Sequence, residues 1–275
     1  RKVNLATILG TYQSTMTHFP YLRKIWNRNT EEERLLGVSL TGILDNKILG
    51  DTIVQTKTLL EKLKVEAAET NKLLASDLGI PVSTAITCVK PSGTVSQLVD
   101  SASGIHPRHS RYYIRRIRGD KKDPLSTFMM EQGIPFEDCV MRPESTTIFS
   151  FPKKAPHNAL LREDLTAVQH LDLWMMYQQH WCEHKPSVTI SVNESEWVEV
   201  GAWVWKNFDD VSGVSFLPYD GGTYKQAPYE ECSEEEYKEL LHKMPQEIDW
   251  DSLIEVDDNV EGAQQLACTA GACEI

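Results

Sequence analysis

Residues 51–96 run from a long helical pattern into a short β-rich segment and then into a polar loop. Within residues 51–78, Leu, Ile and Ala recur at helical intervals among Lys and Glu, and Gly79 and Pro81 end the pattern. Residues 82–89 form a β-rich run that is short enough for a buried strand. Helices that alternate with short buried strands are typical of α/β proteins, so this succession predicts an α/β fold.

The alternation of helix and strand patterns extends to both sides of this segment. Apolar side chains at helical spacing predict an N-terminal helix packed on the core within residues 1–30. These side chains are Leu5, Ile8, Leu9, Tyr12 and Met16. The further predicted elements are a short buried strand within 37–44, strands within 187–192 and 211–218, a helix at 194–208 and a helix capped by Ser233.

The polar loop at residues 90–96 has the composition of an anion-binding site. Gly93 allows close approach of the backbone, and Ser and Thr hydroxyls surround it. If a helix begins at or just after Thr94, its unpaired N–H groups and the positive end of its dipole point toward whatever occupies the loop. Such a cluster can also be a simple helix cap, and the residues alone leave both interpretations open. The candidate phosphate-binding residues are Pro91, Ser92, Gly93, Thr94, Val95 and Ser96.

The last eight residues carry two thiols, Cys268 and Cys273, on a segment with little reason to fold. The four residues between them are small, and Gly271 can adopt the positive φ that a tight ring can require, so the two sulfurs can meet in a disulfide. Residues 255–265 are acidic and amide-rich with few large apolar groups, which is typical of a mobile tether. We therefore predict a flexible, redox-active tail at residues 251–275.

Two other interpretations of the tail stay open at this point. The cysteines can be accidental neighbours near a disordered terminus, or they can supply half of a zinc site. Zinc requires four ligands, and no second Cys/His pair with suitable spacing occurs, so we predict no metal site. The remaining cysteines are interpreted as small buried hydrophobic side chains. They are scattered singly, at Cys88, Cys139, Cys182 and Cys232.

Charge and hydropathy restrict the partners of the chain. Forty acidic against 28 basic residues give the 275 residues a formal charge of −12, which would repel a nucleic-acid backbone over most of the surface. No stretch approaches the roughly 20 apolar residues that cross a bilayer, so we expect no membrane partner. Six cysteines without a dense framework fit a reducing, cytoplasmic location. The chain begins at Arg1 inside an apolar pattern, and we expect that its natural start is missing.

Four segments in a fixed order are similar to one enzyme family. The longest is residues 87–116, which contains the polar loop, and the others are residues 37–42, 215–228 and 268–275. Together they resemble the adenosylcobalamin-dependent (class II) ribonucleotide reductases, and in form they are closest to the monomeric triphosphate reductases. Several spaced motifs in order are far more specific than one motif alone.

The resemblance implies a fold and a chemistry. It implies that residues 1–250 are the C-terminal part of a ten-stranded α/β barrel and that residues 251–275 are its redox tail. The implied activity is reduction of ribonucleoside triphosphates to 2′-deoxyribonucleoside triphosphates by thiyl-radical chemistry, with adenosylcobalamin as the cofactor that starts the radical. Residues 91–96 match the loop that holds the substrate phosphates. Cys268 and Cys273 match the pair that passes electrons from thioredoxin to a disulfide in the barrel.

The chain departs from the family in one respect. The finger-loop signature Asn-x-Cys-x-Glu is absent, so we expect the radical cysteine in an upstream N-terminal part of the reductase and no activity from this chain alone. Nucleotide effectors are further implied partners. The cobalamin class is favoured over the oxygen-dependent class because residues 249–267 contain no tyrosine pair. The alternatives are a diphosphate reductase of the same chemistry and a noncatalytic nucleotide-binding module with a thiol-relay tail.

Basic and histidine residues follow the loop in sequence. Arg115, Arg116 and Arg118 form a basic cluster that can face phosphate groups, corrin side chains or only solvent. His106 and His109 can approach a cofactor or substrate, but histidines beside a proline are more often part of loop structure. We therefore assign neither histidine as a ligand.

Overall fold

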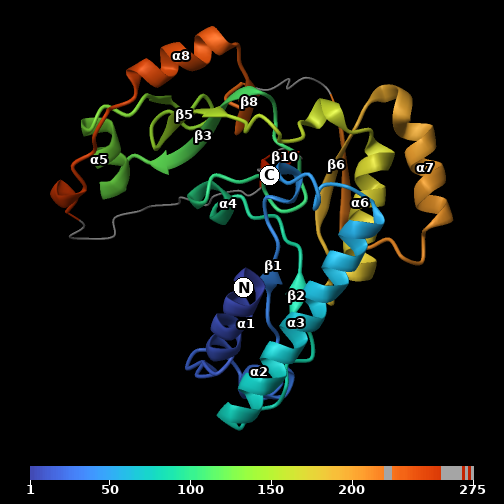
Figure 1. Cartoon of the computed structure of the whole chain (residues 1–275). Helices are drawn as coiled ribbons and strands as arrows, with labels where there is room; N and C mark the ends of the chain where they lie inside the picture. The colour runs from blue at the N-terminus through green and yellow to red at the C-terminus, as the bar shows by residue number, and fades with distance from the viewer. Residues whose placement is uncertain (220–224, 255–267, 270–271, 274–275) are drawn as a thin grey trace.

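The computed structural model describes residues 1–219 and 225–254, together with the backbone of residues 268–269 and 272–273. Figure 1 shows three regions. An arm holds the N-terminal helices and two short strands, a lobe is built on an antiparallel sheet, and a third region combines two parallel strands with two helices. The prediction of mixed helices and strands is confirmed.

The arm contains α1 (Lys2–Gln13), α2 (Lys24–Glu33) and the long helix α3 (Val54–Leu78). The C-cap of α3 is Gly79, which has a left-handed φ of 65°, so the predicted end of this helix is confirmed. Helices α1 and α3 pack side by side.

The prediction of which face of α1 is buried is wrong. Its apolar side chains point largely outward, and Leu9 is 70% exposed. Val3, Thr7 and Thr11 are buried instead. The threonine hydroxyls can be buried because each donates to a carbonyl one turn earlier, at 2.9 and 2.8 Å, and because Asn71 from α3 donates to Thr11 at 2.9 Å.

Two pairs of parallel strands lie next to the arm. Strand β1 (Val38–Ser39) pairs with β2 (Thr87–Cys88), and β6 (Val188–Val192) pairs with β7 (Val214–Pro218). All four lie inside segments that the sequence predicted as strands. The first pair is only two residues long, because the chain on either side of it enters loops.

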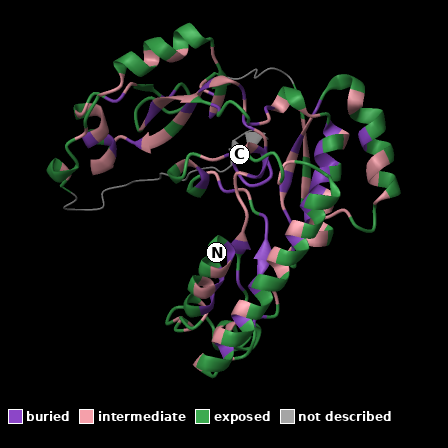
Figure 2. Cartoon of the chain, viewed as in Figure 1, coloured by how far each residue is buried: buried purple, intermediate pink, exposed green. Residues whose placement is uncertain are grey.

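Two helices complete this region. Helix α6 (Ala167–His180) packs against β6, and α7 (Trp197–Lys206) packs against α6. The main hydrophobic core fills the space between these helices, the parallel strands and α3, where buried residues gather in Figure 2. Its large buried side chains include Leu60, Leu171, Trp174, Tyr177, Trp181 and Ile190. The sequence predicted α7 but not α6.

The lobe contains a four-stranded antiparallel sheet in the order β4-β5-β3-β8. Its elements are β3 (Tyr112–Asp120), α5 (Pro124–Glu131), β4 (Phe136–Asp138), β5 (Thr146–Lys154), β8 (Tyr229–Glu231) and α8 (Glu234–Lys243). Only α8 was predicted from the sequence. The predicted cap is confirmed, since Ser233 Oγ accepts from the Glu236 N–H at 3.1 Å.

A closed barrel does not occur among the described residues. Their strands form four separate sheets, and the largest has four strands, so the ten-stranded barrel stays a prediction. Short elements connect the regions, namely η1 (Ile43–Asp45), η2 (Arg162–Asp164), η3 (Glu194–Glu196) and η4 (Trp250–Ser252). Within the described part, no helix combines the length and the apolarity needed to cross a membrane. The predicted tether at 255–265 lies outside the described residues.

Candidate functional site

The predicted phosphate loop lies between β2 and the single-turn helix α4 (Val95–Leu98), between the arm and the lobe (Figure 1). The helix begins one residue after Thr94, as predicted. Among the residues that the structure describes, none accepts a hydrogen bond from the backbone N–H of Gly93, Thr94 or Val95. Three consecutive N–H groups without an acceptor are the donor set of an anion-binding loop.

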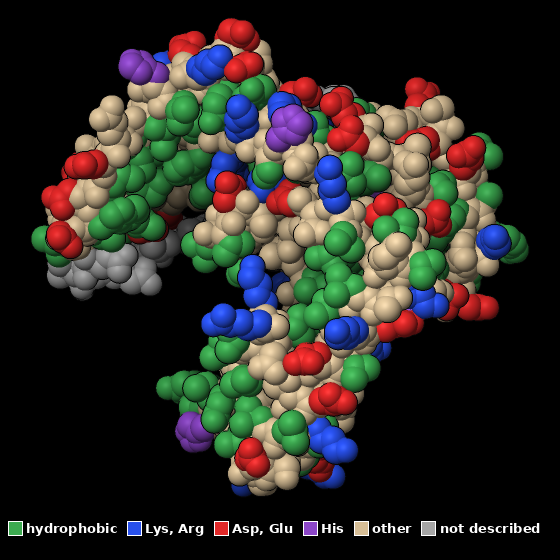
Figure 3. Space-filling view, in the orientation of Figure 1, with side chains coloured by type: hydrophobic (Ala, Val, Ile, Leu, Met, Phe, Trp, Pro, Cys, Tyr) green, Lys and Arg blue, Asp and Glu red, His purple; other side chains and the backbone are tan. Residues whose placement is uncertain are grey.

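The dipole of α4 contributes less than the sequence suggested. A helix of four residues aligns few peptide dipoles, so the unpaired N–H groups are the stronger feature that this loop offers to an anion. The loop is also accessible. Figure 3 shows a hollow between the lobe and the arm, with Lys and Arg side chains near its edge. Lys90, at the start of the loop, is exposed, so its charge offsets part of the acidic net charge there.

The three predicted hydroxyl donors have different roles. Ser96 Oγ donates to the carbonyl of Ser92, so it stabilises the loop. Ser92 is buried, its N–H donates to Ser103 Oγ at 3.1 Å, and its hydroxyl lies 2.8 Å from Thr41 Oγ1. Thr94 is exposed and makes no side-chain cap bond, so its hydroxyl is the one that can reach a ligand.

Thr41 holds the segment after the loop against the segment after β1. Its hydroxyl donates to the Ala102 carbonyl at 3.0 Å and accepts from the Gly104 N–H at 2.9 Å. Gly104 has a φ of 57°, and a Cβ there would lie 2.6 Å from the carbonyl oxygen of Lys90. Only glycine fits this close approach between the chain that enters the loop and the chain that leaves it.

A buried ion pair stabilises the same region. Arg108, 3% exposed at its side chain, donates from Nε and Nη2 to the two carboxylate oxygens of Asp45, at 3.0 and 2.8 Å. Asp45 also accepts from the Ala102 N–H at 2.7 Å. Burial lowers the pKa of Arg108, but its bonds to Asp45 and Tyr113 outweigh burial, and the pKa is raised above its ordinary value. A bidentate, buried pair of this kind fixes local geometry.

His106 connects the loop region to β6. Its Nε2 accepts from the Thr189 N–H at 2.9 Å, which assigns the proton to Nδ1, and Nδ1 donates to the Ser103 carbonyl at 2.9 Å. The neighbouring His170 donates from Nε2 to the Ile105 carbonyl at 2.8 Å. Both rings are buried and neutral, and both are used inside the fold, which agrees with the interpretation of His106 as loop structure.

These two histidines predict acid sensitivity. Burial, followed by the nearby His106, lowers the pKa of His170 from 6.5 to about 4. Burial also lowers the pKa of His106. Below pH 6.5 these histidines bind protons in the unfolded chain but not in the folded chain. The free energy of unfolding should therefore fall as the pH drops from about 6.5 to about 4. At 1.36 kcal/mol per pKa unit, the effect of His170 alone is about 3 kcal/mol.

Urea unfolding at pH 7 and pH 4.5 measures this effect. We expect the chain to lose more free energy of unfolding between these two pH values than the His170→Gln variant does, by about 2 kcal/mol. The His157→Gln variant is the control, because it makes the same substitution at an exposed histidine. An identical loss in the unmodified chain and in His170→Gln would contradict the buried, neutral state of His170.

The predicted basic cluster is used within the lobe. Arg116 pairs with Glu230, and Arg115 lies over the ring of Tyr229, 4.4 Å from its centroid. Arg118 donates to the Gln226 carbonyl at 3.1 Å. His109 stacks on Tyr229, and burial, followed by the nearby Arg162, lowers its pKa to about 3. These contacts favour a structural role over contact with a corrin.

Three of the four cysteines outside the tail are buried, as predicted, but the prediction is wrong for Cys232, which is only half-buried. Cys88 and Cys139 are buried. Burial, followed by the nearby Cys88, raises the pKa of Cys182 to about 12, so this thiol is inert at neutral pH. Cys232 lies among acidic side chains, and burial followed by these charges raises its pKa. Within the described part, no cluster of three or more His, Cys, Asp or Glu side chains could hold a metal ion.

The tail cysteines are opposite one another in a short hairpin. β9 (Cys268–Thr269) and β10 (Ala272–Cys273) pair antiparallel, with Cys268 the direct partner of Cys273. Directly opposed residues in antiparallel strands have Cα atoms about 4.5–5.5 Å apart, which lies within the range for disulfides.

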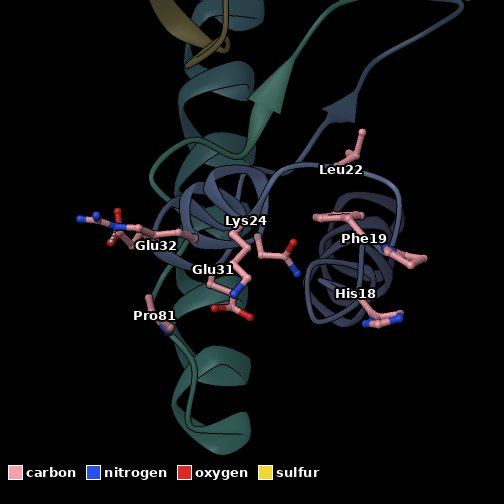
Figure 4. A pocket seen from close by; sticks show the side chains of 10 residues that line it. His18, Phe19, Leu22, Lys24, Glu31, Glu32 and Pro81 are labelled. Atoms are coloured by element: carbon pink, nitrogen blue, oxygen red, sulfur yellow. Dashed lines mark hydrogen bonds and ion pairs between the residues drawn. The ribbon is translucent and has the colours of Figure 1, made fainter.

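A cavity of about 720 Å³ lies elsewhere on the arm (Figure 4). It is lined by the α1–α2 connection, by α2 and by Pro81, with His18, Phe19 and Lys24 among its side chains. None of the site residues predicted from the sequence lines it. We therefore do not connect it with the phosphate loop.

Comparisons with known proteins bear on the resemblance. No profile of a known protein family matches the chain. The adenosylcobalamin-dependent ribonucleoside-triphosphate reductase of Euglena gracilis is 30% identical over 264 residues, which cover 95% of this chain and 36% of that enzyme. The protein of the same name from Lactobacillus gasseri is 27% identical, over 98% of this chain and 40% of that enzyme. The chain is related to the adenosylcobalamin-dependent ribonucleotide reductases.

A solved structure agrees with this relationship. The crystal structure of a B12-dependent (class II) ribonucleotide reductase matches 90% of the chain and 38% of its own chain, with a TM-score of 0.76 and 24% identity, which shows a shared fold. The chain spans 36–40% of the length of the two curated reductases. The resemblance that the four sequence motifs indicated is therefore confirmed.

The residues that hold the loop in place were not predicted from the sequence. Thr41 lies in a segment that resembles the reductases, but nothing in the sequence paired it with Ser92, 51 residues later. Asp45 and Arg108 were not singled out by any sequence pattern, and they are separated by 63 positions.

Proposed function

We propose that this chain is the C-terminal part of an adenosylcobalamin-dependent ribonucleoside-triphosphate reductase. The whole enzyme would convert ribonucleoside triphosphates to 2′-deoxyribonucleoside triphosphates. The observation that carries the proposal is the alignment with curated enzymes of that name, which covers 95–98% of this chain. Residues 1–250 would contribute to the catalytic barrel, whose remaining strands would come from an upstream part that also carries the radical cysteine.

In this proposal, residues 91–96 hold the substrate phosphates. The supporting observations are the N–H groups of Gly93, Thr94 and Val95, which have no acceptor among the described residues, and the exposed hydroxyl of Thr94. Backbone donors suit phosphate because they need no positive side chain in the loop. Nucleotide effectors would bind elsewhere in the enzyme.

The second proposed role belongs to the tail. Cys268 and Cys273 would reduce the disulfide that forms in the barrel during each turnover and would then be reduced by thioredoxin. Two electrons and two protons pass from the tail dithiol to the barrel disulfide by thiol–disulfide exchange, so the tail is left as a disulfide. The opposed positions of Cys268 and Cys273 in the β9–β10 pairing support this role.

Adenosylcobalamin would supply the radical when it is bound to the complete enzyme. We assign none of the described side chains to it. The sequence candidates His106, Arg115 and Arg116 make their contacts inside the fold.

Competition between substrates tests the proposed function. The complete reductase is supplied with adenosylcobalamin, a dithiol and an equimolar mixture of labelled ribonucleoside di- and triphosphates. We expect deoxyribonucleoside triphosphate as the main product. Mainly diphosphate product would favour a diphosphate reductase, and no deoxynucleotide would favour a noncatalytic nucleotide-binding role.

A further inference from the structure

Asp100, which follows α4, has an unusual backbone conformation. Its φ is 46°, and in the described part only Arg34 and Gln226 share a positive φ among residues other than glycine. The left-handed region is unfavourable for residues with a Cβ, although Asp tolerates it better than most. Such a conformation persists where surrounding contacts hold it, and it is often found at functional sites.

Two cations from different parts of the fold hold Asp100. Arg108 Nη2 donates to its backbone carbonyl at 2.7 Å, and Arg108 Nη1 lies 3.5 Å from its carboxylate. Lys153, on β5 of the lobe, lies 3.4 Å from the same carboxylate oxygen. Partial burial raises the pKa of Asp100, but Lys153 and Arg108 together lower it below its ordinary value. The carboxylate is therefore charged at neutral pH.

The turn at Asp100 sends the chain back against the loop. Directly after it, the Ser101 N–H donates to the Ser96 carbonyl at 2.9 Å, and the Ala102 N–H donates to Asp45 at 2.7 Å. Ser96 in turn bonds to the Ser92 carbonyl. The geometry of residues 92–96 thus depends on the direction that the chain takes at residue 100.

We infer that Asp100 is a positioning residue for the substrate triphosphate. Held between Arg108 and Lys153, it keeps the loop in the shape that presents the N–H groups of residues 93–95 together. This inference rests on the proposed function of that loop. Because Lys153 belongs to the lobe, the same contact links the position of the antiparallel sheet to the loop.

Three variants of the complete reductase test the inference. Asp100→Ala loses both ionic contacts and a residue that tolerates the left-handed region, so KM for CTP should rise about tenfold, with kcat changed less than about twofold. Asp100→Asn keeps that tolerance and a side-chain oxygen for Arg108, and should bring KM back to within about threefold of the wild-type value. Lys153→Met removes only the lobe contact and should raise KM by about threefold.

A matched control separates positioning from general destabilisation. Arg34 has a φ of 48° at the end of α2, in the arm, and its guanidinium donates to the Ser14 carbonyl at 2.7 Å. Arg34→Ala likewise removes side-chain contacts at a left-handed residue, and it should lower Tm without raising KM. A KM for Asp100→Ala no higher than that for Arg34→Ala would overturn the inference. So would equal KM values for the Asn and Ala variants.

The inference and the proposed function fail in different ways. If Gly93→Val weakens substrate binding and neither Asp100→Ala nor Lys153→Met does, the loop keeps its role and the positioning role of Asp100 is wrong. If none of the three affects KM, the loop does not hold the substrate. If Asp100→Ala fails to fold, Asp100→Asn and Lys153→Met test the inference instead. Two results together would then overturn it: a wild-type KM in Lys153→Met, and unchanged amide hydrogen exchange at residues 92–96 in both of these variants.

Discussion

Cys268→Ser and Cys273→Ser are each expected to lose ribonucleotide reduction by at least about 100-fold when thioredoxin is the electron donor, because a hydroxyl cannot take part in thiol–disulfide exchange. With a small dithiol such as dithiothreitol, which can reach the barrel disulfide directly, most of the activity should remain. The measurement is the rate of deoxynucleotide formation by the complete reductase with each reductant in turn.

The residues between the two cysteines supply the control. Ala272→Ser changes the same hairpin by one oxygen atom and keeps both thiols, so its rates should match those of the wild type with both reductants. A loss of equal size with thioredoxin and with dithiothreitol in the cysteine variants would reject the relay role. It would indicate instead that the two cysteines act in the chemical step or in folding.

Replacement of Gly93 by valine should weaken binding of the substrate triphosphate at least about tenfold, which corresponds to about 1.4 kcal/mol. The branched side chain would stand beside the N–H groups of Thr94 and Val95 and would keep a phosphate away from them. Gly93 is not among the described glycines with a positive φ, so the backbone itself should accept valine. KM for CTP, compared with kcat, measures the effect.

Gly201 provides the matched substitution. It lies in α7, where a Cβ would meet no atom within 4 Å, so Gly201→Val makes the same chemical change far from the loop. Its KM should equal that of the wild type. An unchanged KM in Gly93→Val would remove the loop from the substrate site.

Some of this fold could be predicted because its signals are local. The apolar spacing of α3 and the glycine that ends it, the alternating residues of β6 and the cap of α8 all lie within a few residues of one another. The antiparallel sheet could not be predicted in this way. Strand β3 carries Arg115 and Arg116 among its apolar residues, and its partner β5 begins 26 residues after β3 ends, so neither its composition nor its pairing is visible locally.

The candidate site, too, could be predicted only where its signals are local. The loop itself was predicted because its glycine and hydroxyl residues are contiguous, and the start of α4 after Thr94 followed from them. The supports from Thr41, Asp45 and Lys153 depend on contacts between residues 51 to 63 positions apart, which the fold alone brings together. The buried face of α1 was wrongly predicted because threonine hydroxyls that bond to the helix carbonyls can be buried.

Photo-crosslinking tests the central claim most directly. A ribonucleoside triphosphate with a photoreactive group on its γ-phosphate is bound to the complete reductase, irradiated and mapped by mass spectrometry. We expect the label on residues 91–96, suppressed by excess unlabelled substrate and strongly reduced in Gly93→Val. Substrate-protected labelling at another segment, with residues 91–96 unlabelled, would contradict the assignment of this loop to the substrate phosphates.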